Sequence, residues 1–279
     1  MKLWKRIVVF FVLLTLGLML LFFGESAVIK LRLLKEIGKI EEQVEPSVAP
    51  EKELKFAVMS DIHLDTENLE KALVLAKVDK VDFVIVTGDM TSLGKKEELK
   101  KVKKVLDNSG LEYYVVPGNH DLWASRQFKT DIYSEVFRKD YQSFWQNKVK
   151  FILINNGSYF GLGEEQKNWL KEEVKECQYF ACLVFAHIPL NHPISLHVMG
   201  EDNPKVASEA GEIIRTLVDN KIEQIFVGHV HYSAEYELQG LKTVVVGAIT
   251  GNRNVQSPKF LEVWEEGNEW NKKEIFLDK

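Results

Sequence analysis

Side chains that bind metal ions or transfer protons recur in five short groups between positions 61 and 231. The groups are DIH (Asp61, His63), GD (Asp89), GNHD (Asn119, His120, Asp121), AH (His187) and GHVH (His229, His231). A single Gly-Asp pair is usually only a turn. Five groups in this order, however, supply the mixed nitrogen and oxygen ligands that suit Mn, Fe or Zn ions. The pattern therefore indicates a metal centre.

The spacing within two of these groups has a physical explanation. In D-x-H and H-x-H, alternate residues of an extended segment point to the same side. We therefore expect Asp61 and His63 to approach one ion together, and His229 and His231 to reach neighbouring ions. The glycines at positions 88, 118 and 228 are expected to allow tight backbone turns beside the ions.

Short apolar runs precede these groups and predict the strands that position them. The predicted strands are residues 55–60, 82–87, 113–117, 151–155, 182–186, 224–228 and 242–247. Runs rich in Val, Ile and Phe are typical of strands buried on both faces. Segments 68–78, 97–110, 164–176 and 209–220 have apolar residues at helical spacing, so the alternation predicts an α/β domain. The five groups fall at the carboxyl ends of strands, where open α/β sheets bind their ligands.

The motifs resemble those of the calcineurin-like metallophosphoesterases, and their order is similar to that of the cyclic-nucleotide phosphodiesterase branch. The resemblance covers roughly residues 54 to 250 and includes a helix motif made by Gly163, Gln166, Trp169 and Leu170. It implies a four-layer α/β/β/α sandwich that hydrolyses phosphate esters, with phosphodiesters, cyclic nucleotides among them, as the first expectation. It also implies two divalent or trivalent metal ions, and the ligand types suit Mn, Fe or Zn without choosing among them.

The resemblance implies a role for each residue of the five groups. One metal ion would be bound by Asp61, His63, Asp89 and His231. The other would be bound by Asp89, Asn119, His187 and His229, with Asp89 bridging the two. A bridging hydroxide would attack phosphorus while the ions hold the phosphoryl oxygens. His120 would protonate or stabilise the leaving oxygen, and Asp121 would either orient His120 or cap a turn.

The chain departs from the family pattern at one position. Many relatives have an acid three residues after the bridging Asp, where this chain has Ser92. We therefore do not expect a carboxylate to orient His120 from that position. The same departure makes a protein phosphatase a weaker prediction than a phosphodiesterase, because that branch carries the acid.

Candidates for substrate binding lie in three loops. Arg126 belongs to stretch 122–148, whose aromatic and cationic residues would hold a base and a phosphate, or would form an amphipathic helical insertion packed on the core. His192 lies in loop 191–205, where it would contact substrate, support the site or face solvent. Asn252 lies in the loop that follows the last predicted strand and is expected to return to the same edge.

The N-terminal part of the chain predicts a membrane segment. Residues Ile7–Phe23 carry no charge and would span roughly 25 Å as a helix. We interpret residues 1–24 as an uncleaved anchor or a signal segment, residues 25–52 as a helical juxtamembrane linker, and residues 53–279 as the phosphoesterase domain. The cations Lys2, Lys5 and Arg6 before the run favour an inside N-terminus, which would place the domain outside the cytoplasm.

The overall composition excludes some functions and leaves others open. The net charge of -5 argues against general nucleic-acid binding, although a single nucleotide remains a possible substrate. With only Cys177 and Cys182, an all-thiolate metal site and a disulfide framework are excluded. We expect Cys177 and Cys182 to be two small half-buried residues. A disulfide between them is the alternative if the domain is exported. A phosphomonoesterase, a phospholipid or cell-envelope phosphoesterase and a catalytically silent membrane-bound scaffold are the alternative functions, and the oligomeric state is open.

Overall fold

The computed structural model describes residues 54–278 except Lys129 and Asn268, together with Phe11, Leu14, Thr15 and Lys35. The predicted membrane segment 7–23 and linker 25–52 lie outside the described residues, apart from these four positions. In the described part of the chain, no helix has the length and apolar character needed to cross a membrane. The chain divides into two compact units, residues 1–52 and 53–279, and the fold below is that of the second unit.

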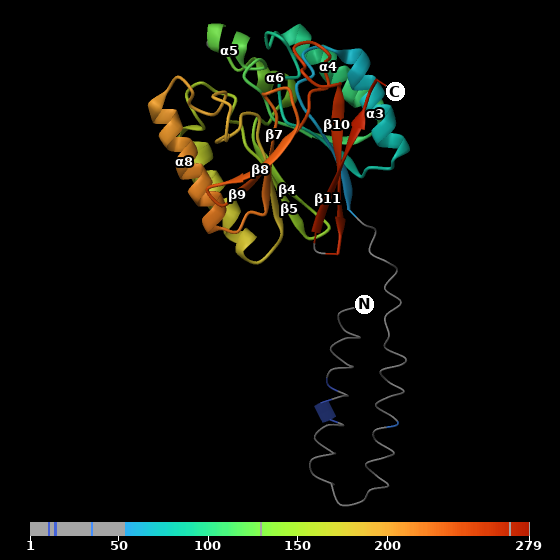
Figure 1. The fold of residues 1–279 in the computed structure, drawn as a ribbon, viewed down its shortest axis with the longest axis vertical. Helices are drawn as coiled ribbons and strands as arrows, with labels where there is room; N and C mark the ends of the chain where they lie inside the picture. The colour runs from blue at the N-terminus through green and yellow to red at the C-terminus, as the bar shows by residue number, and fades with distance from the viewer. Residues whose placement is uncertain are drawn as a thin grey trace, which may run out of the picture. The chain divides into compact units, whose positions relative to one another are not determined.

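Two β-sheets form the centre of this unit (Figure 1). The first sheet has the order β11-β10-β1-β2-β3, with β1 (Lys55–Met59), β2 (Phe83–Val86), β3 (Glu112–Val115), β10 (Lys259–Glu266) and β11 (Glu269–Phe276). The second sheet has the order β4-β5-β6-β7-β9-β8, with β4 (Gln142–Gln146), β5 (Val149–Leu153), β6 (Cys182–Phe185), β7 (Gln224–Val227), β8 (Ala234–Leu238) and β9 (Leu241–Val245). The inner strands pair in parallel, β1 to β3 in one sheet and β5, β6, β7 and β9 in the other, and antiparallel strands complete the edges.

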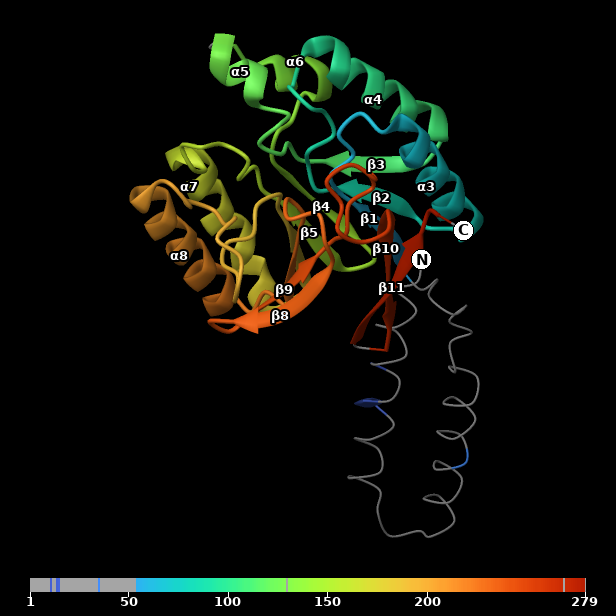
Figure 2. The same cartoon turned by 45° about the horizontal axis from the view of Figure 1, so that its top comes forward.

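Helices cover the outer face of each sheet, α7 and α8 on one side of the unit and α3 and α4 on the other (Figure 2). The helices are α3 (Thr66–Val78), α4 (Lys96–Ser109), α5 (Trp123–Phe128), α6 (Ile132–Phe137), α7 (Gly163–Glu173), the short 3₁₀-helix η1 (Val174–Gln178) and α8 (Pro204–Asp219). Residues at the N-termini of two helices explain where these helices begin. The Asp65 side chain caps α3 by accepting a hydrogen bond from the backbone N–H of Asn68, and Pro204 occupies the first turn of α8.

The strands alternate their side chains between two apolar layers. On β1, Phe56 and Val58 pack into the layer between the sheets, whereas Ala57 and Met59 pack under α3 and α4. A separate layer lies under α7 and α8, on the other side of the second sheet. The predicted α/β fold with two packed sheets is therefore confirmed, in the order helices, sheet, sheet, helices. Because the described apolar clusters draw only on residues 54–277, we expect residues 53–279 to fold without the first unit.

All seven predicted strands and all four predicted helices are present, with small shifts at their ends. Four strands were not predicted: β4, β8 and the long β10–β11 hairpin. Stretch 122–148, for which a helical insertion was one prediction, forms α5, α6 and the edge strand β4.

The prediction of two separate half-buried cysteines was wrong. Cys177 and Cys182 are both buried and form a disulfide, because η1 turns the chain back and brings their Cα atoms to 5.5 Å.

Candidate metal centre

The carboxyl ends of the parallel strands of both sheets meet at one edge of the unit. Ser60, directly after β1, forms an isolated parallel bridge with Ala248, which follows β9 of the other sheet. The His187 ring, after β6, donates from Nδ1 to the carbonyl oxygen of Thr87, after β2, at 2.8 Å. These contacts join the two sheets where the five sequence groups lie, so side chains distant in sequence converge there.

Three of the predicted ligands form the first cluster, on the β1 and β7 loops. The Nε2 atoms of His63 and His231 lie 3.0 Å apart. Asp61 Oδ1 lies 3.4 Å from His231 Nε2 and 4.0 Å from His63 Nε2. Ligand atoms of all three residues fall within 4.8 Å of one another, so this cluster could hold a metal ion.

The second cluster is built by the loops after β2, β3, β6 and β7. Asp89 Oδ2 lies 3.3 Å from His187 Nε2, and Asn119 Oδ1 lies 3.2 Å from the same nitrogen. Asp89, His187 and His229 together form a second group able to hold a metal ion. Asp89 Oδ2 also lies 3.6 Å from His63 Nε2 of the first cluster. One carboxylate therefore faces both clusters, which is the position a bridging ligand needs.

The backbone at these ligands is not extended, which corrects the explanation given for D-x-H and H-x-H. Asp61 and His63 have φ of 53° and 46°, His229 and His231 have φ of 72° and 59°, and Asp89 has φ of 50°. Non-glycine residues rarely adopt this left-handed region, and such residues concentrate at functional sites. The paired ligands approach each other through tight left-handed turns instead of strand alternation.

Glycine is required at position 118 by close packing. A Cβ there would lie 2.1 Å from Asp89 Oδ1 and 2.3 Å from the Asp89 backbone nitrogen. The absence of a side chain thus lets the β3 loop approach the carboxylate that faces both clusters.

The charges of the site fit a bound cation. Asp61 and Asp89 are almost completely buried, and among the described residues no Lys or Arg forms an ion pair with either carboxylate. Buried charges of this kind require a partner. In addition, the buried Nδ1 of His231 has no hydrogen-bond partner within the described structure. Asp, Asn and His side chains are suitable ligands for Mn, Fe or Zn, so the residues present fit the two metal ions that the resemblance implies.

The histidines differ in their protonation. Burial lowers the pKa of His187, but the charge and hydrogen bond of Asp89, the charge of Asp61 and the hydrogen bond to Thr87 together outweigh burial and raise this pKa to about 9. Burial raises the pKa of the Asp89 carboxyl, but the charge and hydrogen bond of His187 and the charges of His63 and His120 together outweigh burial, so this pKa lies well below its usual range. Burial, followed by the charge of His187, lowers the pKa of His229 to about 3, and burial also lowers the pKa of His63. These shifts favour the charged form of His187 and the neutral forms of His63 and His229.

His120 lies beside the clusters and is held by a carbonyl group. Its ring centre is 4.8 Å from that of His63, and its Nδ1 lies 2.7 Å from the carbonyl oxygen of Ser92. A carbonyl only accepts hydrogen bonds, so Nδ1 donates and Nε2 remains for other partners. Position 92 thus orients His120 through its backbone, although its side chain lacks the acid found in relatives.

Asp121 is completely buried and holds two loops together. Its carboxylate accepts from the backbone N–H groups of Met90, Thr91 and Gly118 and from the Thr91 hydroxyl, at 2.8–3.1 Å. Burial and the charge of Asp89 raise the pKa of Asp121 to about 6, although these hydrogen bonds lower it. The contacts described for the Asp121 side chain go to the β2 and β3 loops rather than to His120.

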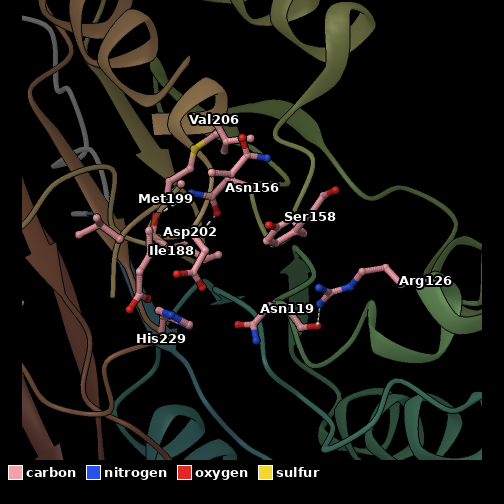
Figure 3. A pocket seen from close by; sticks show the side chains of 15 residues that line it. Asn119, Arg126, Asn156, Ser158, Ile188, Met199, Asp202, Val206 and His229 are labelled. Atoms are coloured by element: carbon pink, nitrogen blue, oxygen red, sulfur yellow. Dashed lines mark hydrogen bonds between the residues drawn. The ribbon is translucent and has the colours of Figure 1, made fainter. Parts of the chain in front are cut away.

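The three candidates for substrate binding lie in different places. Arg126 lines a cavity of about 160 Å³ together with Asn119 and His229 (Figure 3). Its Nη2 donates to the carbonyl oxygen of Asn119 at 2.6 Å, and its Nε is buried without a partner. Asn252 lines a neighbouring cavity of about 380 Å³ with His63 and His120. His192 lines neither of these two cavities and bonds its own loop and Tyr232.

Two supporting residues were not predicted for the site itself. Asn156 follows β5, and its Oδ1 accepts from the backbone N–H groups of His187 and Ile188 at 3.0 and 2.9 Å. Gln166, named only as part of a helix motif, pairs with the backbone of Asn155 through both Oε1 and Nε2. The signal for Asn156 was its place directly after the fourth predicted strand, at the same edge as the ligands.

Comparison with known proteins gives consistent matches. A family model described as calcineurin-like phosphoesterase matches residues 54–233. A protein of Pongo abelii named serine/threonine-protein phosphatase CPPED1 is 30% identical over 169 residues, which are 55% of this chain and 52% of that protein. A probable cyclic nucleotide phosphodiesterase of Vesicomyosocius okutanii is 25% identical over 201 residues, 67% of this chain and 82% of that protein.

A solved structure of a dimetal phosphatase from Danio rerio has the same fold. Its TM-score is 0.60 at 15% identity, over 80% of this chain and 96% of that chain. At this identity the likeness concerns the fold and not the reaction. The match to CPPED1 spans about half of that protein's length.

Proposed function

Because the chain belongs to the calcineurin-like phosphoesterase family, we propose that it is a metal-dependent hydrolase of phosphate esters, with phosphodiesters as its main substrates. The observation that carries the proposal is the position of Asp89, whose Oδ2 faces His187 at 3.3 Å and His63 at 3.6 Å. Each side of this carboxylate has a group of side chains able to hold a metal ion. Two metal ions bound there would activate a water molecule and neutralise the charge of the phosphoryl group.

The protein's own residues would bind the two ions, orient the His120 ring and transfer the proton. Asp61, His63 and His231 would bind one ion and Asn119, His187 and His229 the other, with Asp89 shared. The Ser92 carbonyl fixes the His120 ring, so that Nε2 is the atom that can give a proton to the leaving oxygen. Arg126 lines the cavity beside Asn119 and His229, where its guanidinium would hold an anionic oxygen of the substrate.

The preference for diesters rests on space around the centre and on the relatives. Two cavities adjoin the metal ligands, one at His229 and Asn119 and the other at His63 and His120. A diester carries a group on each side of phosphorus, and each cavity can accept one. The relative named as a probable cyclic nucleotide phosphodiesterase supports a nucleotide diester as the first candidate.

A phosphomonoesterase is the second candidate, because the relative with 30% identity is named a protein phosphatase. A catalytically silent scaffold is the third. A scaffold is free to lose ligands, but all seven predicted ligand positions carry a metal-binding side chain in this chain.

We also propose that residues 7–23 anchor the protein in a membrane and that the phosphoesterase domain faces away from the cytoplasm. The uncharged run and the cations before it support this orientation. The disulfide between Cys177 and Cys182 supports it independently, since disulfides persist in oxidising compartments. Protease added to intact cells should digest the domain, and full protection would contradict this orientation.

The test of the function is a set of assays on residues 53–279 with added Mn. Bis-(p-nitrophenyl) phosphate should be hydrolysed faster than p-nitrophenyl phosphate, and a chelator should abolish both activities. Asp89→Asn should remove nearly all activity and bound metal, because it removes the one carboxylate charge shared by the two clusters. Asp107→Asn, the same substitution on the exposed face of α4, is the matched control and should keep full activity. Activity that survives the chelator would contradict the proposal.

A further inference from the structure

Large apolar side chains are exposed around the metal centre. They follow the carboxyl ends of four strands, in the segments after β3, β5, β6 and β9. They are Trp123, Tyr159, Phe160, Ile194, Leu196 and Val255, and we call this set the apolar rim. Four of them, Phe160, Ile194, Leu196 and Val255, are between 74% and 86% exposed. Side chains of this size at such exposure, gathered around one opening, indicate contact with an apolar partner.

Contacts connect the rim to residues of the metal centre. The Trp123 ring lies 6.4 Å from that of His120. Leu196 immediately precedes His197, whose ring lies 6.3 Å from that of His229. Val255 belongs to the loop that carries Asn252 into the cavity of His63 and His120. Rim residues therefore lie in the same loops as residues that line the centre and its two cavities.

Apolar side chains also line part of the cavity beside the metal ligands, and we call this part the apolar wall. The cavity that contains Asn119 and His229 is lined on one side by Ile188, Val198, Met199 and Val206. Figure 3 shows Ile188, Met199 and Val206 along the cavity, with His229 at one end. Tyr159 lines the same cavity and is half exposed, so it belongs to both the wall and the rim. The cavity is also lined by polar residues, Asn156, Glu201 and Asp202 among them, so a substrate group in it would contact apolar carbon along part of the lining.

We propose that the rim contacts a lipid bilayer and that the substrate is a phosphoester of an apolar alcohol resident in that bilayer. This inference rests on the proposed function and specifies its substrate class. A lipid phosphoester is the occupant that fits both observations, since its phosphate would reach the centre while its chain lies along the wall and its neighbours contact the rim. The rim side chains project from four separate segments, which suits insertion into a lipid surface better than a single peptide groove. The uncharged run at residues 7–23 is a second feature of the sequence that predicts association with a membrane.

Two measurements on residues 53–279 test the inference. The first is sedimentation with vesicles of phosphatidylcholine and phosphatidylglycerol. The second is hydrolysis of p-nitrophenyl alkyl phosphates with methyl, hexyl and dodecyl chains. The domain should bind the vesicles, and kcat/KM should rise about tenfold or more from methyl to hexyl, because each buried CH₂ contributes to binding.

The variant that carries Phe160→Ser and Leu196→Ser tests the rim itself. Vesicle binding should weaken about 100-fold, at roughly tenfold for each apolar side chain removed from lipid. The control carries Val74→Ser and Val78→Ser, which alter two equally exposed apolar residues on α3, and it should bind vesicles as the wild type does. A second control, Tyr179→Ser with Phe180→Ser, alters exposed aromatic residues at the opposite, amino edge of the second sheet.

The outcomes separate this inference from the proposed function. If no alkyl ester is hydrolysed with Mn present, the proposed function is wrong. If all esters are hydrolysed with equal kcat/KM and the vesicles are not bound, the function stands and the lipid inference is wrong, which would favour a protein partner for the rim. Loss of vesicle binding in the Tyr179 and Phe180 variant, but not in the rim variant, would also overturn the inference, because it would place the lipid contact at the opposite edge.

Discussion

Replacement of Asp121 by Asn distinguishes a structural role from a catalytic role for this residue. One carboxylate oxygen accepts from the backbone N–H groups of Met90 and Gly118, and the other accepts from the N–H and the hydroxyl of Thr91. All the partners are donors, and the carboxylate is fully buried. An Asn side chain has one acceptor oxygen and one NH₂ group, so either orientation turns a donor toward two donors.

The expected loss of stability follows from this count. Two buried donors would lose their acceptor, at about 1–3 kcal/mol each, and the Thr91 hydroxyl can recover part of that by rotating. We expect the free energy of unfolding to fall by about 3 kcal/mol for Asp121→Asn. For a unit of this size, such a loss corresponds to a melting temperature about 6–12 °C lower. Bound metal should fall as well, because the weakened loops carry Asp89 and Asn119.

The assay is thermal and urea unfolding of residues 53–279, with metal content and turnover measured on the same samples. Asp131→Asn is the matched control, because Asp131 accepts from Ser134 at the start of α6 and Asn caps helices equally well. Its unfolding should stay within about 0.5 kcal/mol of the wild type. An Asp121→Asn protein that unfolds at the wild-type midpoint, keeps its metal and turns over 100-fold more slowly would refute the structural role and support direct action on His120.

Three further predictions concern the metal centre. His120→Ala should lower turnover by about 100-fold or more at unchanged metal content, and equal loss of both would mean that His120 is a ligand. Mn affinity, measured by calorimetry, should rise about tenfold per pH unit between pH 7 and pH 9. The reason is that the ion must displace the proton on His187, whose pKa is about 9. An Mn affinity that does not change with pH would contradict this protonation. Gly118→Ala should abolish metal binding, since the new Cβ would lie 2.1 Å from Asp89 Oδ1, and retained metal with normal activity would show that this loop can move aside.

The part of the fold that positions the metal centre was predictable, because the parallel strands are buried on both faces. Phe83 to Val86 and Cys182 to Phe185 are completely or almost completely buried, and such strands appear in sequence as unbroken apolar runs. The ligand groups could be found for the same reason, since each follows such a run. The ligand-type residues and the buried apolar runs before them thus gave two independent signals for the same edge of the fold.

The edge strands were not predicted, because they mix burial with charge. Strand β8 has the sequence AEYEL with Glu235 and Glu237 exposed, and β11 is partly buried along most of its length with exposed residues among them. The Gly267 turn between β10 and β11 was a hairpin signal that the analysis of apolar runs did not use. The disulfide was predicted only as an alternative for an exported domain, because its formation depends on the turn of η1 and on the compartment.

The conformation of the ligand backbone is the feature that no sequence pattern indicated. Left-handed φ angles at non-glycine residues cost about 1–3 kcal/mol each where the surroundings impose them. Here the surroundings are hydrogen bonds between loops: the N–H groups of Ile62 and His63 both donate to the carbonyl of Asp89, and the N–H of His229 donates to the Asp61 carboxylate. Each ligand loop is therefore held by another ligand loop. These hydrogen bonds between loops, together with the packed core under them, offset the strain at the ligands.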